Sequence, residues 1–310
     1  MSFSSNVKEE ISRQEVSTKE EASALLYAVI ASIGVIGLSS SGMQIKLNLE
    51  NRPAAKHIST LLEEFFGERC GIAVKNSNLN QKKIYELTVD GKDNVLELLS
   101  SLGFREGTLF LSHAPQGDIA DTQEKQIGFL RGLFLACGTL NHPKKNYQAE
   151  FVLQSGDFAE WVLEFINNIG LSAKSILRKS DYVIYLKGGD NISALLSLLG
   201  AFTSLLDFEN VRAYKDIRNN TNRAANCEVA NFTKTYGSAQ EYLELIDIID
   251  DSAGLSSLTD TLREAAELRR EYPEYSLSEL SEVSGISKSA LNHRMRKIRQ
   301  IANGIKEDAK

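Results

Sequence analysis

The sequence predicts an α+β protein in which a duplicated αββαββα domain with pseudo-twofold symmetry is followed by an all-α helix-turn-helix domain. Three observations predict this fold class. One order of helices and strands occurs twice in the first 205 residues, each copy begins with a helix rich in small residues, and the last third has helical spacing throughout. We expect the first domain at 1–208, a linker at 209–226 and the second domain at 227–310.

Composition limits what the chain can be. Its 310 residues suffice for two domains with separate cores, and 42% hydrophobic with 25% charged residues is typical of soluble globular proteins. Because the net charge is −6, any nucleic-acid contact must be confined to a local basic patch. The three cysteines and four histidines are scattered, so we expect free thiols in a reducing cytosol, no metal and no cofactor.

The only long uncharged run lies near the N-terminus, after a polar segment that is not a signal peptide. Residues 22–45 carry no charge, but their apolar core at 24–38 is shorter than the ~20 residues of a membrane span. Ser32, Gly34 and Gly37 interrupt it as well. We therefore expect a buried helix, then a strand and a turn, and no membrane association.

The two copies can be aligned directly. GKDNVLELLSSLG (91–103) and GGDNISALLSLLG (188–200) agree at eight of thirteen positions. Each copy has an alternating, strand-like stretch, an amphipathic helix and two further short strands. The copies span about 20–105 and 122–205. The matched pairs are 46–51 with 150–155, 52–67 with 156–170, 71–76 with 172–177 and 84–89 with 182–187.

The opening helices, LLYAVIASIG (25–34) and FLRGLFLACG (129–138), have small residues at matching positions. Ala28 aligns with Gly132, and Ser32 aligns with Ala136 one turn later. Small residues four apart share one helix face and let two backbones approach closely. We expect the copies to join at this helix pair, with the final glycines of both stretches, 34 and 138, in the left-handed conformation that ends helices.

FLRGLFLACG resembles the LAGLIDADG helix of homing endonucleases, with Leu130, Gly132, Leu133, Ala136 and Gly138 in place. The resemblance implies a LAGLIDADG-like domain, in which the residue before the last glycine is an acidic metal ligand. Ile33 and Cys137 occupy those two positions here. Because Mg²⁺ needs hard oxygen ligands, we expect no metal, no catalytic residues and no enzyme activity.

The sheets of the first domain leave two uses open. A saddle over duplex DNA is implied by the endonuclease resemblance, and a platform for a protein partner is the alternative. Acidic residues such as Glu86 and Asp181 also occur on these strands. The basic residues of the strand regions are Lys46, Lys75, Lys82, Lys83, Lys174, Arg178 and Lys179.

The expected linker, NVRAYKDIRNNTNRAAN (210–226), contains four basic residues, one acidic residue and five asparagines. Arg218 and Arg223 are candidate phosphate contacts in it, and a plain connector is the alternative. Two helices are expected next, at 236–251 and at 255–273.

Residues at about 275–304 have the features of a helix-turn-helix. Ser276 and Glu279 fit a capping box, and Gly285 lies where a tight turn needs positive φ. Ser287 is expected to cap the second helix. The expected inward residues are Leu277, Leu280 and Val283 of the first helix, Ile286 of the turn, and Leu291, Met295, Ile298 and Ala302 of the second.

The distribution of charge indicates the function of this second helix. Between residues 283 and 306 there are six basic residues and no acidic one. Asparagine can pair with adenine and arginine or lysine with guanine, from the N-terminal half of a recognition helix. We therefore predict double-stranded DNA as the partner and no small-molecule substrate. The predicted DNA-contacting residues are Ser287, Lys288, Ser289, Asn292, His293 and Arg296, with Arg294, Lys297 and Arg299 directed at phosphates.

Over nearly its whole length the chain is similar to the WhiA regulators of Gram-positive bacteria. RNNTNRAANCEVAN (218–231) and SGISKSALNHRMRKI (284–298) carry most of this resemblance. It implies a sequence-specific transcription regulator of cell division and chromosome segregation, and of sporulation in spore-formers. The resemblance also implies that the protein lies in the cytoplasm, associated with the nucleoid. Another transcription factor or RNA polymerase is the implied protein partner. A protein-interaction scaffold with incidental nucleic-acid affinity is the alternative.

Overall fold

The computed structural model describes residues 2–39, 42–76, 83–105, 111, 113–115 and 117–308. The chain divides into two compact units, Met1–Lys215 and Asp216–Lys310. The division falls inside helix α8 (Phe202–Ala253). The stretch 209–226, expected as a linker, is therefore helical. It contains neither proline nor glycine, the two residues that most disfavour a helix interior.

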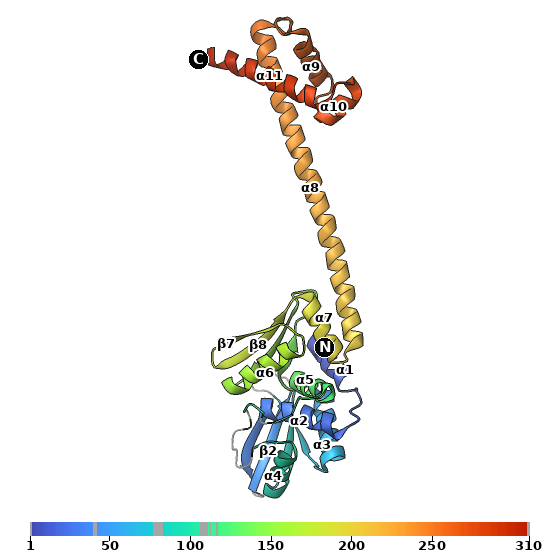
Figure 1. The fold of residues 1–310 in the computed structure, drawn as a ribbon, viewed down its shortest axis with the longest axis vertical. Helices are drawn as coiled ribbons and strands as arrows, with labels where there is room; N and C mark the ends of the chain where they lie inside the picture. Colours follow the sequence, from blue (N-terminus) through green and yellow to red (C-terminus); the bar gives the residue numbers. More distant parts are fainter. Residues whose placement is uncertain are drawn as a thin grey trace. The chain divides into compact units, whose positions relative to one another are not determined.

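The first unit contains the expected duplication (Figure 1), with αββαββα order in both copies. The first copy consists of α2 (Lys19–Ile33), β1 (Gly34–Ser39), β2 (Gly42–Leu49), α3 (Arg52–Phe66), β3 (Gly71–Asn76), β4 (Lys83–Asp90) and α4 (Lys92–Ser101). The second consists of α5 (Gln123–Cys137), β5 (Gly138–Leu140), β6 (Gln148–Leu153), α6 (Gly156–Asn168), β7 (Ala173–Arg178), β8 (Asp181–Lys187) and α7 (Gly189–Leu198).

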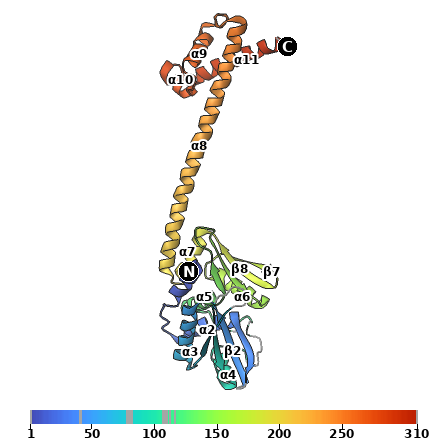
Figure 2. The same ribbon diagram turned by 180° about the vertical axis from the view of Figure 1, so that it is seen from behind.

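Each copy forms one antiparallel four-stranded sheet, in the order β1-β2-β4-β3 or β5-β6-β8-β7. Residues directly opposite in a ladder share a face, so Leu47 with Leu87 and Phe151 with Ile184 direct their side chains into the core. Helices α2 and α5 lie side by side at the centre of the unit (Figure 2). Their buried residues join both copies into a single core.

Two glycines of α5 make the close approach of these helices possible. A Cβ added at Gly132 would lie 2.1 Å from the carbonyl oxygen of Leu25, and one at Gly128 would lie 2.5 Å from that of Glu21. The expected helix contact at Gly132 is therefore confirmed. Gly128, one turn earlier on the same face, is a second contact point that sequence analysis missed.

The predicted conformation of the two final glycines is wrong. Gly34 and Gly138 have φ of −72° and −73° with extended ψ, because each helix passes directly into a strand. Lack of space favours glycine here instead. An added Cβ would lie 2.4 Å from the carbonyl oxygen of Ile30 in the first copy, and 2.6 Å from the ring of Phe134 in the second.

A helix before the first copy, α1 (Phe3–Ile11), connects several parts of the first unit. Val7 and Ile11 are fully buried against the common core. The carboxylate of Glu10 accepts hydrogen bonds from the backbone N–H of Thr203 at 2.6 Å and of Ser204 at 3.0 Å. It thereby satisfies backbone donors that the start of α8 leaves without helical partners.

The second unit is helical, as expected. The C-terminal part of α8 packs with a short 3₁₀ helix η1 (Leu255–Ser257), α9 (Asp260–Glu271), α10 (Leu277–Ser284) and α11 (Lys288–Asp308). Residues such as Ile246, Ala265 and Met295 form its core. Among the residues that the structure describes, no helix combines the length and apolar character needed to cross a membrane.

Candidate nucleic-acid interface

The turn between α10 and α11 is fixed by local hydrogen bonds. The backbone N–H of Ser276 donates to the carboxylate of Glu279 at 2.6 Å, and the Ser276 hydroxyl accepts from the Glu279 N–H at 3.3 Å. This is the expected capping box. Gly285 has φ of 72°, the left-handed value expected at the turn. The hydroxyl of Ser287 accepts from Ala290 N–H at 3.3 Å and so caps the start of α11.

The predicted inward face of α11 is confirmed, because Leu291, Met295, Ile298 and Ala302 are all fully buried. The prediction for Val283 is wrong, since 52% of this residue is exposed. In an α-helix, a side chain three residues later points ~60° away from the first around the helix axis. Val283, six residues after Leu277, therefore does not share the buried face of Leu277 and Leu280. Ser284, four residues after Leu280, is half-buried instead.

On the opposite side of α11 the predicted DNA-contacting side chains come together. Lys288, Asn292 and Arg296 are exposed and four residues apart, so they form one row along the helix. Ser289, His293 and Lys297 are exposed and form a second row beside it. Within the described part of the chain, Lys288, Arg296 and Lys297 form no ion pair. These cations are therefore available to an anionic partner.

Two of the predicted phosphate contacts differ from the others. Arg294 is half-buried and pairs with Glu264 of α9 at 2.7 Å. Arg299 pairs with Glu241 of α8 at 2.8 Å, and its guanidinium lies 4.7 Å from the centre of the Tyr242 ring. Both side chains therefore tie α11 to its own unit. The remaining candidates, Arg218 and Arg223, are exposed on α8.

A shallow hollow of 540 Å³ between the start of α9 and the first turns of α11 borders these rows. Thr259 and Thr261 contribute hydroxyl groups to it, opposite His293 and Lys297. Hydroxyls beside cations are common donors to nucleic-acid phosphates. Sequence analysis missed the two threonines. Thr259, just before α9, is equally typical of a helix cap that faces no ligand, and Thr261, in the first turn of α9, belongs to no motif that indicates a ligand.

Arg269 is a further residue that sequence analysis missed. It is only 2% exposed and donates to the carbonyl oxygens of Tyr272 at 3.2 Å and Tyr275 at 2.6 Å. Burial lowers the pKa of its guanidinium. Since these carbonyls lie between α9 and α10, Arg269 holds the first helix of the pair in place. Its spacing from Ala265 and Ala266 places it on the inward face of α9, which is the sequence signal that could have found it.

The helix ends that carry metal ligands in the LAGLIDADG motif have different chemistry here. Ile33 and Cys137 are half-buried, and burial raises the pKa of the Cys137 thiol to about 11. The ammonium of Lys8 donates to the carbonyl oxygen of Leu135 at 3.0 Å, which places a cation beside this corner. Among the described residues, no three His, Cys, Asp or Glu side chains are grouped to hold a metal ion.

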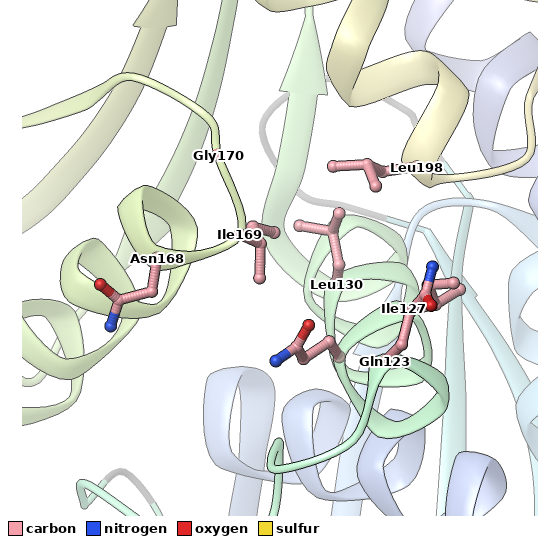
Figure 3. A pocket seen from close by; sticks show the side chains of 8 residues that line it. Gln123, Ile127, Leu130, Asn168, Ile169, Gly170 and Leu198 are labelled. Carbon is pink, nitrogen blue, oxygen red and sulfur yellow. The ribbon is translucent and has the colours of Figure 1, made fainter.

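A second hollow, of 510 Å³, lies between α5, the end of α6 and the end of α7 (Figure 3). Leu130, Ile169 and Leu198 line it with aliphatic surface, and Gln123 adds an amide at its border. None of its lining side chains titrates, so it offers no general acid, base or nucleophile. The other lining residues are Gln126, Ile127, Asn168 and Gly170.

Cations on the outer faces of the sheets are partly neutralised. Lys75 pairs with Glu86 at 2.6 Å, and Arg178 pairs with Glu150 at 3.2 Å. Lys75 and Glu86 lie on the neighbouring strands β3 and β4, whereas Arg178 of β7 reaches across β8 to Glu150 of β6. Lys82 lies outside the described residues. The sheets therefore present less free positive charge than their sequence suggested.

The chain thus combines a duplicated LAGLIDADG-like domain with a C-terminal helix-turn-helix domain. Three family models match it in succession: the WhiA N-terminal LAGLIDADG-like domain at 19–105, the WhiA LAGLIDADG-like domain at 126–218 and the WhiA C-terminal HTH domain at 221–302. The chain belongs to the WhiA family.

Individual relatives agree with this assignment. A "Probable cell division protein WhiA" of Clostridium perfringens is 40% identical over 312 residues, with 99% of both chains covered. Its namesake in Clostridium acetobutylicum is 38% identical over the full length of both. The crystal structure of full-length DUF199/WhiA from Thermotoga maritima has a TM-score of 0.60 at 22% identity over 98% of both chains. An isolated N-terminal LAGLIDADG domain of DUF199/WhiA has a TM-score of 0.51 at 19% identity, over 64% of this chain and 90% of that one. These two structures support the fold.

Proposed function

We propose that the protein is a sequence-specific regulator of transcription that binds double-stranded DNA through α11. The observation that carries the proposal is the exposed row of Lys288, Asn292 and Arg296 on a helix capped and held in a helix-turn-helix. A chain with a net charge of −6 concentrates six basic residues and no acidic one at 283–306. Such a patch attracts phosphates locally without making the whole surface basic.

In the proposed complex the N-terminal half of α11 enters the major groove. The Asn292 amide pairs with an adenine edge and the Arg296 guanidinium with a guanine. Lys288 and Lys297, with the hydroxyls bordering the α9–α11 hollow, bind the backbone on either side. Arg294 and Arg299 would first have to leave Glu264 and Glu241, so we assign them a positioning role with phosphate contact secondary.

The first unit, on this proposal, cuts no DNA. Two properties support this: Ile33 and Cys137 supply no hard oxygen ligand, and the Lys8 ammonium near the same corner disfavours a divalent cation. The sheet-face ion pairs favour a protein partner over duplex DNA for this unit, with another transcription factor or RNA polymerase as the proposed class. The relatives named as probable cell division proteins support a role in cell division. Chromosome segregation, sporulation in spore-formers and a nucleoid-associated cytoplasmic location are part of the same proposal.

The competing function is a protein-interaction scaffold with incidental nucleic-acid affinity, favoured by the paired sheet cations. A genome-wide binding map, followed by gel shifts on an occupied site, separates the two. Replacing both Asn292 and Arg296 with alanine should reduce affinity for the site about 30- to 20,000-fold, since two good bidentate contacts of ~1–3 kcal/mol each contribute ~2–6 kcal/mol together. Lys306→Gln is the control, because Lys306 is exposed and basic but lies at the far end of α11. Unchanged occupancy in the double variant would favour the scaffold.

A further inference from the structure

A basic hollow in the first unit has no role in the function proposed above. It measures 610 Å³ and lies between the C-terminal end of α1 and the first half of α3. Three permanent cations line it, Arg13, Arg52 and Lys56, together with His57 and Thr60, and none of its lining residues is acidic. In a chain with a net charge of −6, such a grouping of cations from α3 and from the turn after α1 needs an explanation.

Two basic residues of α3 destabilise this helix when it is considered by itself. Arg52 and Lys56 are exposed and four residues apart, so they repel each other by a few tenths of a kcal/mol. Arg52 also lies in the first turn, where the helix dipole disfavours a cation. Arg13, just after α1, is paired with Glu9 of that helix. Arg52 and Lys56 form no ion pair among the described residues, so an anion between them would relieve both unfavourable terms.

The duplication provides an internal comparison. In the alignment of the two copies, Arg52, Lys56, His57 and Thr60 of α3 correspond to Gly156, Glu160, Trp161 and Glu164 of α6. Both helices fold with the same inward faces against their sheets. The fold of the repeat therefore does not require basic residues at these positions. Their presence in one copy only, and beside α1, indicates a function specific to this hollow.

His57 and Thr60 would complete an anion site with neutral donors. Burial, together with the charge of Arg131, lowers the pKa of His57 to about 4, so the ring is neutral at pH 7. A neutral imidazole still offers one N–H donor, and the Thr60 hydroxyl offers another. Guanidinium and ammonium groups with such donors match the oxygens of a phosphoryl group.

We propose that this hollow binds a small, multiply charged phosphate anion of the pyrophosphate or nucleoside triphosphate class, with Arg52 and Lys56 as the principal contacts. Its size and the small number of cations fit two or three linked phosphoryl groups better than a duplex, which needs a longer row of cations. The site lies wholly in the first unit and is independent of DNA binding by α11.

The test is isothermal titration calorimetry of the full chain at 0.1 M salt, with pyrophosphate as the first probe and ATP as the second. We expect one site per chain for at least one of these two probes. Arg52→Gln combined with Lys56→Gln should weaken that binding at least tenfold, and Lys56→Glu, which introduces the charge of the second copy, should weaken it as well. Lys174→Gln, a charge loss on exposed β7, should bind as the wild type does.

All substituted positions are exposed, and circular dichroism with thermal melting checks that each variant is folded. Absence of heat with both probes would overturn the proposal, as would equal losses in the Arg52/Lys56 and Lys174 variants. A nonspecific 20-base-pair duplex serves as a third titrant. If the Arg52/Lys56 variant lost duplex binding while neither small anion bound, the hollow would be a DNA-backbone contact and the proposal would be wrong.

Discussion

Replacing Gly132 by alanine should destabilise the first unit, although alanine favours helices. The added Cβ would lie 2.1 Å from the Leu25 carbonyl oxygen, whereas ordinary contacts begin at 3.4 Å. The backbone oxygen cannot rotate aside, so α2 and α5 must separate by roughly 1 Å in a close-packed core. Overpacking costs ~1–3 kcal/mol and the gain in helix propensity is about 1 kcal/mol. With the cost at its upper end, we expect a net loss of about 2 kcal/mol.

For a unit of this size, such a loss lowers the melting temperature by about 4–8 °C. Differential scanning calorimetry of the full chain measures it, and assigns the transition by comparison with a control in the other unit. Gly304→Ala in α11 is that control, because no atom lies within 4 Å of its added Cβ and alanine should raise stability by up to ~1 kcal/mol. If Gly132→Ala instead raised the melting temperature of the first unit, the close approach of α2 and α5 would be refuted.

Three further predictions concern charge and ionisation. Lys297→Gln should reduce the slope of log affinity against log salt concentration by about 1 and leave the base preference unchanged. Fluorescence anisotropy on duplex DNA measures both quantities. An unchanged slope would show that Lys297 does not contact the DNA backbone. Cys137, with a pKa of about 11, should react with iodoacetamide at pH 8 far more slowly than exposed Cys227 in peptide-resolved mass spectrometry, and equal rates would contradict its burial. Burial alone would raise the pKa of Glu10, but the hydrogen bonds that its carboxylate accepts from the start of α8 lower this pKa below 4.5. The stabilising contribution of Glu10 is therefore present above pH 4.5 and is lost as the pH falls through the lowered pKa. Glu10→Gln should accordingly flatten the acid side of a plot of unfolding free energy against pH, and parallel curves would contradict the cap.

The sequence was sufficient for the fold because the duplication supplied each element twice. A strand that is ambiguous in one copy is supported by its counterpart at the same spacing, as with 71–76 and 172–177. The element α1 had no counterpart, and its polar composition concealed that Val7 and Ile11 enter the core. Likewise the glycines after α2 and α5 suggested helix caps, whereas they are needed where a helix meets a strand without space for a Cβ.

The candidate site could be predicted in part. Periodicity was enough to separate the buried residues of α11 from Asn292 and Arg296 on its exposed face. Spacing within one helix says nothing about partners on another, so the pairing of Arg294 with Glu264 and of Arg299 with Glu241 was not foreseen. Those acids lie 30 and 58 residues away in sequence and come close only in the folded unit.

The central claim is that side chains of α11 read base edges, and selection of bound duplexes from a randomised pool tests it most directly. The wild type should select a defined motif, and Asn292→Ala should lose its preference at one base pair while retaining it at the others, with discrimination there falling by ~1–3 kcal/mol. Lys306→Gln should select the wild-type motif. If the Asn292→Ala and Arg296→Ala variants both selected the unaltered motif with undiminished preference, sequence recognition by α11 would be contradicted.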